Sequence, residues 1–178
     1  VLTRLVWRKG THLLVSIIPE VCRRFPYAHF IIGGDGPNRT VIAEIVERHQ
    51  LHERVELLGS VQHCDVPSVL TRGHIFLNTS LTEAFCIAIL EAVSCGLQVV
   101  STRVGGVPEI LPPHMLLLTE PKPASLLAAL FEVIPSARKR PLPNFHLEVS
   151  QMYSWQRVAQ RTVKVYDHVT QRQRLLLS

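Results

Sequence analysis

Short apolar runs alternate along the chain with longer segments whose apolar residues recur three and four positions apart. The short runs are typical of strands, and the longer segments are typical of helices that bury one face. Phe25-Pro26 ends the first of these helices, because a residue before proline disfavours helical conformation. The pattern predicts strands at 1–2, 29–32, 55–58, 75–77, 98–101 and 115–118, and helices at 11–25, 37–50, 66–72, 82–94 and 124–133.

This alternation predicts an α/β fold: a doubly wound parallel sheet, Rossmann-like, with helices on both faces. We expect residues 1–135 to form this domain, residues 136–143 a linker, and residues 144–178 a C-terminal helical segment that packs on the same domain. Ligands of such sheets bind beyond the carboxyl ends of the strands. The loops that follow the strands are therefore the candidate site.

The helix predicted at 82–94 carries two carboxylates, Glu83 and Glu91, which lie eight positions apart around an apolar stretch. On an ideal helix that separation is roughly 12 Å, a scale that suits a sugar nucleotide. One hypothesis is that each glutamate grips a different part of one ligand. The alternative is that Glu83 caps the helix start and Glu91 pairs with a buried cation.

The start of the same predicted helix offers free backbone N–H groups at Ala84, Phe85 and Cys86. Such groups suit a phosphate oxygen. Thr82 can instead cap this helix end, and the two roles are compatible.

Two cations, Arg4 and Lys9, follow the first predicted strand beside a turn at Gly10. Arginine offers a planar fork and lysine a point charge, so the pair suits a pyrophosphate. The alternative is a solvated basic loop.

The turn at 33–37 contains Gly34 and Gly36 but lacks the spacing of a phosphate-binding loop. A structural turn is the favoured interpretation, and either glycine can let the backbone approach a ligand. Gly59 closes the next predicted strand.

Composition narrows the class of protein. The chain has 178 residues, of which 47% are hydrophobic and 19% charged, as in a single globular domain. Lys and Arg number 19 against 14 Asp and Glu, an excess that fits a phosphate-bearing ligand or an anionic lipid surface and is too small to indicate nucleic acid. The four cysteines have no metal-ligand spacing and favour a reducing compartment. The sequence begins inside a predicted strand, so we expect it to be a fragment.

Three motifs occur in order: Arg4 with Lys9, the glycine-rich turn, and Glu83 with Glu91 in the spacing E-x7-E. In this combination the chain, over about residues 1–170, resembles the retaining glycosyltransferases of the two-Rossmann-domain type (GT-B), family 4. Ala84 and Cys86 beside the motif's Phe85 narrow the resemblance to the members that begin glycosylphosphatidylinositol-anchor synthesis.

The resemblance implies a C-terminal donor-binding domain that takes UDP-N-acetylglucosamine and needs no metal or other cofactor. Arg4 and Lys9 would hold the diphosphate, and Glu83 would contact the donor sugar, so these three are the implied catalytic residues. The backbone at 84–86 would assist Glu83, Glu91 would bind the ribose, and Gly59 would lie near the uracil.

The implied acceptor is phosphatidylinositol, bound by an N-terminal domain that is absent from this sequence. The implied partners are the other subunits of a membrane transferase complex at the cytosolic face of the endoplasmic reticulum, and no nucleic acid is implied. Because the acceptor domain and a membrane segment are missing, we expect weak donor binding and no transfer by this chain alone. Two alternatives stay open: a non-catalytic remnant or interaction module, and a family-4 fragment with another nucleotide sugar.

Overall fold

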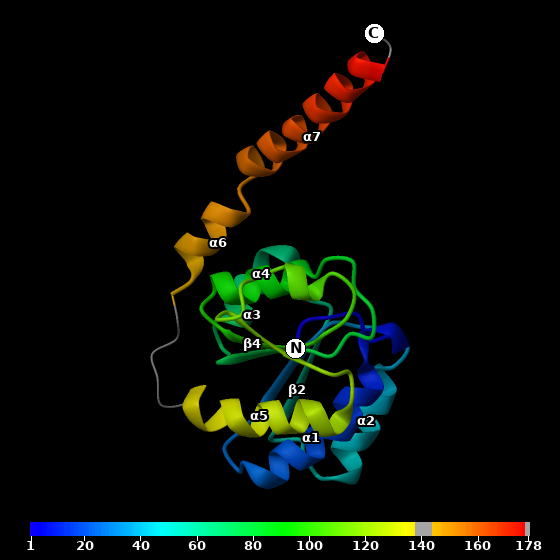
Figure 1. The fold of residues 1–178 in the computed structure, drawn as a ribbon. Helices are drawn as coiled ribbons and strands as arrows, with labels where there is room; N and C mark the ends of the chain where they lie inside the picture. Colours follow the sequence, from blue (N-terminus) through cyan, green and yellow to red (C-terminus); the bar gives the residue numbers. More distant parts are fainter. Residues whose placement is uncertain (138–143, 177–178) are drawn as a thin grey trace.

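The computed structural model describes residues 1–137 and 144–176 (Figure 1). Strands and helices alternate in the predicted order, with ends that differ by a few residues from the predicted ones. The strands are β1 (Phe30–Gly33), β2 (Val55–Gly59), β3 (Ile75–Asn78), β4 (Gln98–Thr102) and β5 (Leu116–Thr119). The α-helices are α1 (Thr11–Arg24), α2 (Arg39–Arg48), α3 (Val66–Leu70), α4 (Ile87–Ser94), α5 (Pro123–Ala137), α6 (His146–Met152) and α7 (Trp155–Leu176).

All strand pairs are parallel, and they form two groups with the orders β1-β2 and β3-β4-β5. The predicted first strand is a single parallel bridge between Leu2 and Gly33 at the free edge of β1. The Thr3 amide extends this pairing by donating to the Gly33 carbonyl at 2.9 Å. The opening residues therefore enter the molecule beside β1.

Helices cover both faces of the strands, as predicted: α1, α2 and α5 lie on one face and α3 and α4 on the other (Figure 1). Each face has its own hydrophobic core. Leu14 and Ile17 of α1 pack with Leu126 of α5 in the first core. Ile89 and Val93 of α4 pack in the second.

The start of α4 corrects the prediction for the glutamate segment. The helix begins at Ile87 rather than Thr82, and Cys86 precedes it in extended conformation without a side-chain cap. The reason is tertiary, because the Glu83 carbonyl accepts the Gly106 amide at 3.0 Å instead of a helical partner. The helical estimate of the separation between Glu83 and Glu91 therefore does not hold, and neither Glu83 nor Thr82 caps the helix.

The end of α4 is as predicted. Gly96 has a positive φ of 85°, which favours glycine. Its amide donates to the Val93 carbonyl at 2.9 Å.

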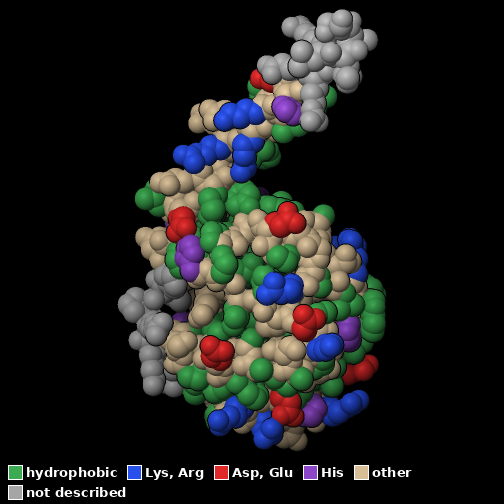
Figure 2. Space-filling model, viewed as in Figure 1, with side chains coloured by type: hydrophobic (Ala, Val, Ile, Leu, Met, Phe, Trp, Pro, Cys, Tyr) green, Lys and Arg blue, Asp and Glu red, His purple; other side chains and the backbone are tan. Residues whose placement is uncertain are grey.

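The C-terminal helices differ in how they relate to the rest of the molecule. Helix α6 contacts α4 and buries Val149. Helix α7 extends away from the α/β body (Figure 1), and residues 155–170 are exposed except for the half-buried Val158. Figure 2 shows basic side chains along this extension. Helix α6 thus contacts the α/β body, while residues 138–143, part of the expected linker, lie outside the described residues.

Candidate functional site

The loops that follow the strands lie against one another and form a common surface. The opening loop, residues 3–10, is bonded to the glycine-rich turn, because the Leu5 amide donates to the Asp35 carbonyl at 2.9 Å. It is also bonded to the loop after β3, because the Leu81 amide donates to the Arg8 carbonyl at 2.8 Å. Residues far apart in the sequence thus meet where a ligand of a parallel sheet is expected.

The glycine-rich turn has the structural role that the sequence favours. A Cβ atom on Gly34 would lie 1.7 Å from the Thr3 carbonyl oxygen, and one on Gly36 would lie 2.5 Å from that of Leu5. Only glycine allows the opening loop to approach so closely. The Gly34 amide also donates to the Gly59 carbonyl at 2.6 Å, which brings Gly59 next to this turn.

An ion pair between Lys9 and Glu83 is the central contact of the surface. It joins the opening loop to the segment before α4 across 74 positions of the sequence. The two side chains are only 19% and 10% exposed, so solvent screens the pair less than a surface salt bridge. Two of the proposed site residues therefore act as one unit.

Ser80 supports this ion pair; it lies in the candidate loop predicted after β3, but the sequence assigned it no role of its own. Its hydroxyl oxygen lies 2.8 Å from Glu83 Oε1 and 3.0 Å from Asn78 Oδ1. Ser80 is fully buried, and its carbonyl accepts the Thr102 hydroxyl. The available signal in the sequence was the polar run 78–80 directly after an apolar strand, where an ordinary core would continue apolar.

The two glycines after β4 pack closely against the backbone of the Glu83 segment. A Cβ atom on Gly105 would lie 1.9 Å from the Glu83 carbonyl oxygen, and one on Gly106 would lie 2.2 Å from that of Ala84. These glycines fix the position of the Glu83 main chain, and with it the carboxylate that meets Lys9.

Arg4 and the apolar residues at the start of α4 face solvent. Among the described residues, the Arg4 side chain has no hydrogen-bond or ion-pair partner. Phe85 and Ile87 are 44% and 63% exposed, which is high for large apolar side chains. The Phe85 ring meets Tyr153 edge to face with centroids 5.6 Å apart. Burial and then the Glu83 carboxylate raise the pKa of the neighbouring Cys86 thiol.

Glu91 lies on α4, and among the described residues it pairs with no buried cation. Its Oε1 atom is 3.9 Å from Nδ1 of His63, an exposed side chain in the loop after β2. Burial and then the Glu91 carboxylate raise the pKa of the Cys95 thiol. The convergence of Glu91 and Arg4 with the Lys9–Glu83 pair on one ligand stays a prediction.

Two cavities of the molecule lie away from these residues. One lies between β1 and β3, and the other lies between residues 109–112 and the helices α6 and α7. In the described ranges, no three His, Cys, Asp or Glu side chains are grouped to hold a metal ion. Within the same ranges, every helix is too short or too polar to cross a membrane.

Comparison with protein families gives one match over most of the chain. Residues 1–136 match the family described as glycosyl transferases group 1.

Comparison with individual proteins agrees with this family. The chain is 56% identical over 173 residues to a human protein, the A component of phosphatidylinositol N-acetylglucosaminyltransferase, in a match that covers 96% of this chain and 36% of the human protein. It is 55% identical over 167 residues to the same component from Arabidopsis thaliana, covering 94% and 37%. The chain thus spans little more than a third of these relatives.

Solved structures match the fold. The crystal structure of Anabaena Alr3699/HepE in complex with UDP-glucose aligns with a TM-score of 0.78 at 24% identity, covering 94% of this chain and 47% of that one. The α/β fold with parallel strands corresponds to the C-terminal half of a GT-B glycosyltransferase.

Proposed function

Because the chain belongs to the group 1 glycosyltransferases, we propose that it is the donor-binding half of a retaining transferase that moves N-acetylglucosamine from uridine diphosphate to phosphatidylinositol. The observation that carries the proposal is the Lys9–Glu83 ion pair, held where the loops after the strands meet. The identity to components of phosphatidylinositol N-acetylglucosaminyltransferase supports this donor and acceptor.

The two cations of the opening loop bind the diphosphate of the donor. Lys9 is already positioned by Glu83, whereas Arg4 is exposed and free to swing onto the second phosphate. Fixed cations stabilise the negative charge that develops on a departing diphosphate, so the reaction needs no metal ion. The carboxylate of Glu83 keeps Lys9 in place while no ligand is bound.

The remaining site residues bind the sugar and the nucleoside. Glu83 accepts hydrogen bonds from hydroxyls of the donor sugar, with the backbone of 84–86 beside it. Glu91 accepts hydrogen bonds from the ribose, near His63. Gly59, which contacts the glycine-rich turn through its carbonyl, lies on the uracil side.

The acceptor half and the setting are proposed from the relatives. Phosphatidylinositol is bound by a separate N-terminal domain that completes the cleft, in a complex with other proteins at the cytosolic face of the endoplasmic reticulum. The exposed Phe85 and Ile87 then form part of the surface that this domain or the ligand covers.

Donor titration of the purified chain tests the proposal. We expect UDP-N-acetylglucosamine to bind weakly, and Lys9→Ala to weaken binding by about tenfold or more, because it removes a charge-assisted hydrogen bond. Arg4→Ala and Glu91→Ala should also weaken it. Arg48→Ala, an exposed position on α2, is the matched control. Equal binding by all four variants would refute the proposed site.

Separate titrations with three nucleotide sugars address the choice of donor. The affinity of the chain for UDP-N-acetylglucosamine, for UDP-glucose and for a guanosine diphosphate sugar is measured by calorimetry. We expect the uridine nucleotides to bind more tightly than the guanosine nucleotide. The opposite order would favour a family member with another donor, and absence of binding by every nucleotide would favour a non-catalytic interaction module.

A further inference from the structure

A groove of about 740 Å³ separates residues 109–112 from the helices α6 and α7. The side formed by this loop and by the end of α6 is mainly apolar and includes Ile110, Leu111, Pro112 and Met152. The Tyr153 hydroxyl, which also lines the groove, donates to the Ile110 carbonyl at 2.6 Å. This hydrogen bond ties the loop to the end of α6, so the apolar side of the groove is a fixed surface.

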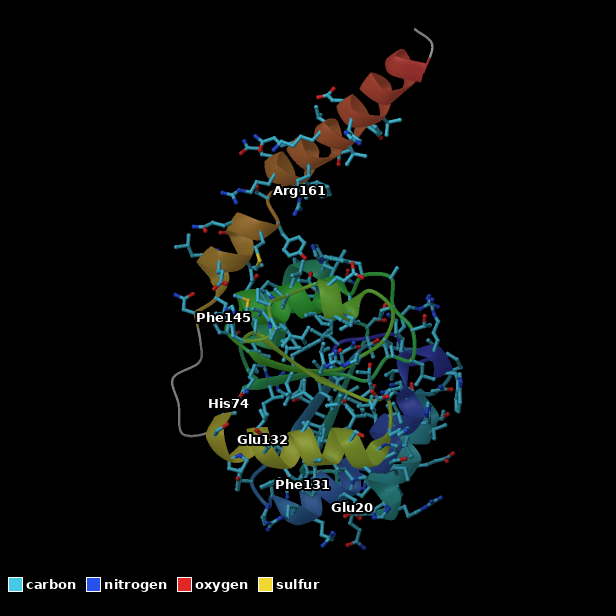
Figure 3. All side chains as sticks on the ribbon, viewed as in Figure 1. Glu20, His74, Phe131, Glu132, Phe145 and Arg161 are labelled. Atoms are coloured by element: carbon cyan, nitrogen blue, oxygen red, sulfur yellow. The ribbon has the colours of Figure 1, made fainter. Side chains whose placement is uncertain are left out.

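The side of the groove formed by α7 is basic. Arg157, Arg161 and Lys164 line it at positions i, i+4 and i+7, which lie on one face of a helix. Arg161 lies where α7 leaves the α/β body (Figure 3). These three residues are called the basic strip of α7 below.

The basic strip is not neutralised within the part of the chain that the structure describes. None of its three side chains forms an ion pair there, and Glu109 is the one acidic side chain that lines the groove with them. Burial raises the pKa of the Tyr153 hydroxyl, and the positive charge of Arg161 opposes that rise, so the guanidinium lies near this hydroxyl. Like charges four residues apart destabilise a helix, and an anion in the groove would remove that cost.

A second strip of α7 is apolar and faces solvent. Trp155, Tyr166 and Val169, called the apolar strip, are each at least 50% exposed. At 3.6 residues per turn they fall within about 60° of one another around the helix, and the basic strip occupies a separate sector of about 60°. A helix with aromatic and aliphatic residues on one face and Lys and Arg beside them is typical of the interface of an anionic bilayer.

We propose that the groove binds the phosphate of an anionic phospholipid, and that the apolar strip of α7 enters the surface of the same bilayer. The basic strip supplies charge-assisted hydrogen bonds to the phosphate oxygens. A free phosphate would leave both the apolar side of the groove and the apolar strip in water, whereas a phospholipid in a bilayer covers them. The contact reads charge, so any anionic headgroup satisfies it, and it does not depend on the acceptor of the proposed reaction.

Flotation of the full chain with lipid vesicles tests the proposal. We expect the chain to bind phosphatidylcholine vesicles that contain phosphatidylserine, and not vesicles of phosphatidylcholine alone. Arg157→Gln together with Arg161→Gln should lower the partition coefficient by at least about tenfold, because each basic residue near an anionic surface contributes to binding. Arg39→Gln together with Arg48→Gln on α2 is the matched control, since it removes the same charge at exposed positions. It should change the partition much less.

Tryptophan emission gives a second readout. The chain has two tryptophans, so Trp7→Phe leaves Trp155 as the single reporter. We expect the emission of this variant to shift to shorter wavelength when vesicles with phosphatidylserine are added, because the Trp155 ring leaves water.

Equal partition of the two double variants would overturn the proposal, and so would equal binding to the two kinds of vesicle. Binding of inorganic phosphate without binding of vesicles would also overturn it, because the basic strip would then serve a soluble anion. A dimer detected by light scattering, again without vesicle binding, would assign the apolar strip to a second copy and overturn it too. None of these readouts uses a nucleotide sugar, so their outcome is independent of the proposed function.

Discussion

Lys9 and Glu83 illustrate how a polar pair can be specified by its surroundings. The Ser80 hydroxyl donates to the Glu83 carboxylate, and Gly105 and Gly106 pack against the main chain of the Glu83 segment. The position in which Lys9 and Glu83 would meet a ligand therefore depends on these supporting residues. Changes to the supporting residues should therefore be visible in the stability of the chain.

The first prediction concerns Ser80. Ser80→Ala should lower the free energy of unfolding by about 1–2 kcal/mol, because it removes the one hydroxyl proton that the Asn78 and Glu83 oxygens share. Urea denaturation measures the change. Ser16→Ala, at an exposed hydroxyl on α1, is the control and should shift stability by less than about 0.5 kcal/mol. Equal losses in both variants would argue against a supporting role for Ser80.

The second prediction separates backbone strain from steric clash. Gly59 and Gly105 both have positive φ, 71° and 50°, but a Cβ atom on Gly59 would meet nothing within 4 Å. Gly59→Ala should cost about 1–2 kcal/mol from conformation alone. Gly105→Ala should cost clearly more, because its Cβ atom would lie 1.9 Å from the Glu83 carbonyl oxygen.

Chemical denaturation of the two glycine variants gives the comparison directly. The excess loss in Gly105→Ala measures the close approach of the two loops. A smaller loss in Gly105→Ala than in Gly59→Ala would contradict the contact.

At the level of elements, hydrophobic periodicity predicted the strands and most of the helices, because burial of one face repeats along each of them. It extended α4 too far, since Ala84 and Phe85 continue the apolar pattern while their segment is held by Gly106. The Lys9–Glu83 pairing was not predictable either, although both residues were candidates, because it depends on packing between loops 74 positions apart.

The third prediction concerns the two C-terminal helices. A chain that ends after Ser154 lacks α7 and should keep its Tm within a degree or two, because α7 is exposed over 155–170 apart from Val158. A chain that ends after Ala137 should unfold at clearly lower temperature. It loses the burial of Val149, worth about 1.5–3 kcal/mol, and the bond from the Tyr153 hydroxyl to the Ile110 carbonyl at 2.6 Å.

Calorimetry of both shortened chains measures these shifts. A large loss on removal of α7 alone would show that this helix stabilises the α/β body in solution.

A chain prepared with Val1 as its first residue should also respond to pH, through the amino group of Val1. The pKa of the Val1 amino group is about 5 in the folded state and 8.0 otherwise. Between these values the unfolded chain binds a proton that the folded chain does not, so stability falls as pH is lowered from 8 to 5. The loss is at most about 4 kcal/mol.

An N-acetylated chain is the control for this fourth prediction, because it cannot titrate at that position. Unfolding in urea at pH 8, 6.5 and 5 should give a steeper decline for the free chain than for the acetylated one. Parallel curves would contradict the expected burial.

The two strand groups are joined, at their carboxyl ends, by the contacts of the opening loop with residues 79–83. A nucleotide sugar held between Lys9 and the glutamates would therefore bridge the two strand groups at the carboxyl ends of their strands. Ligand occupancy would then reinforce the junction of the two strand groups, which the first core also spans through Ile32 of β1 and Leu77 of β3.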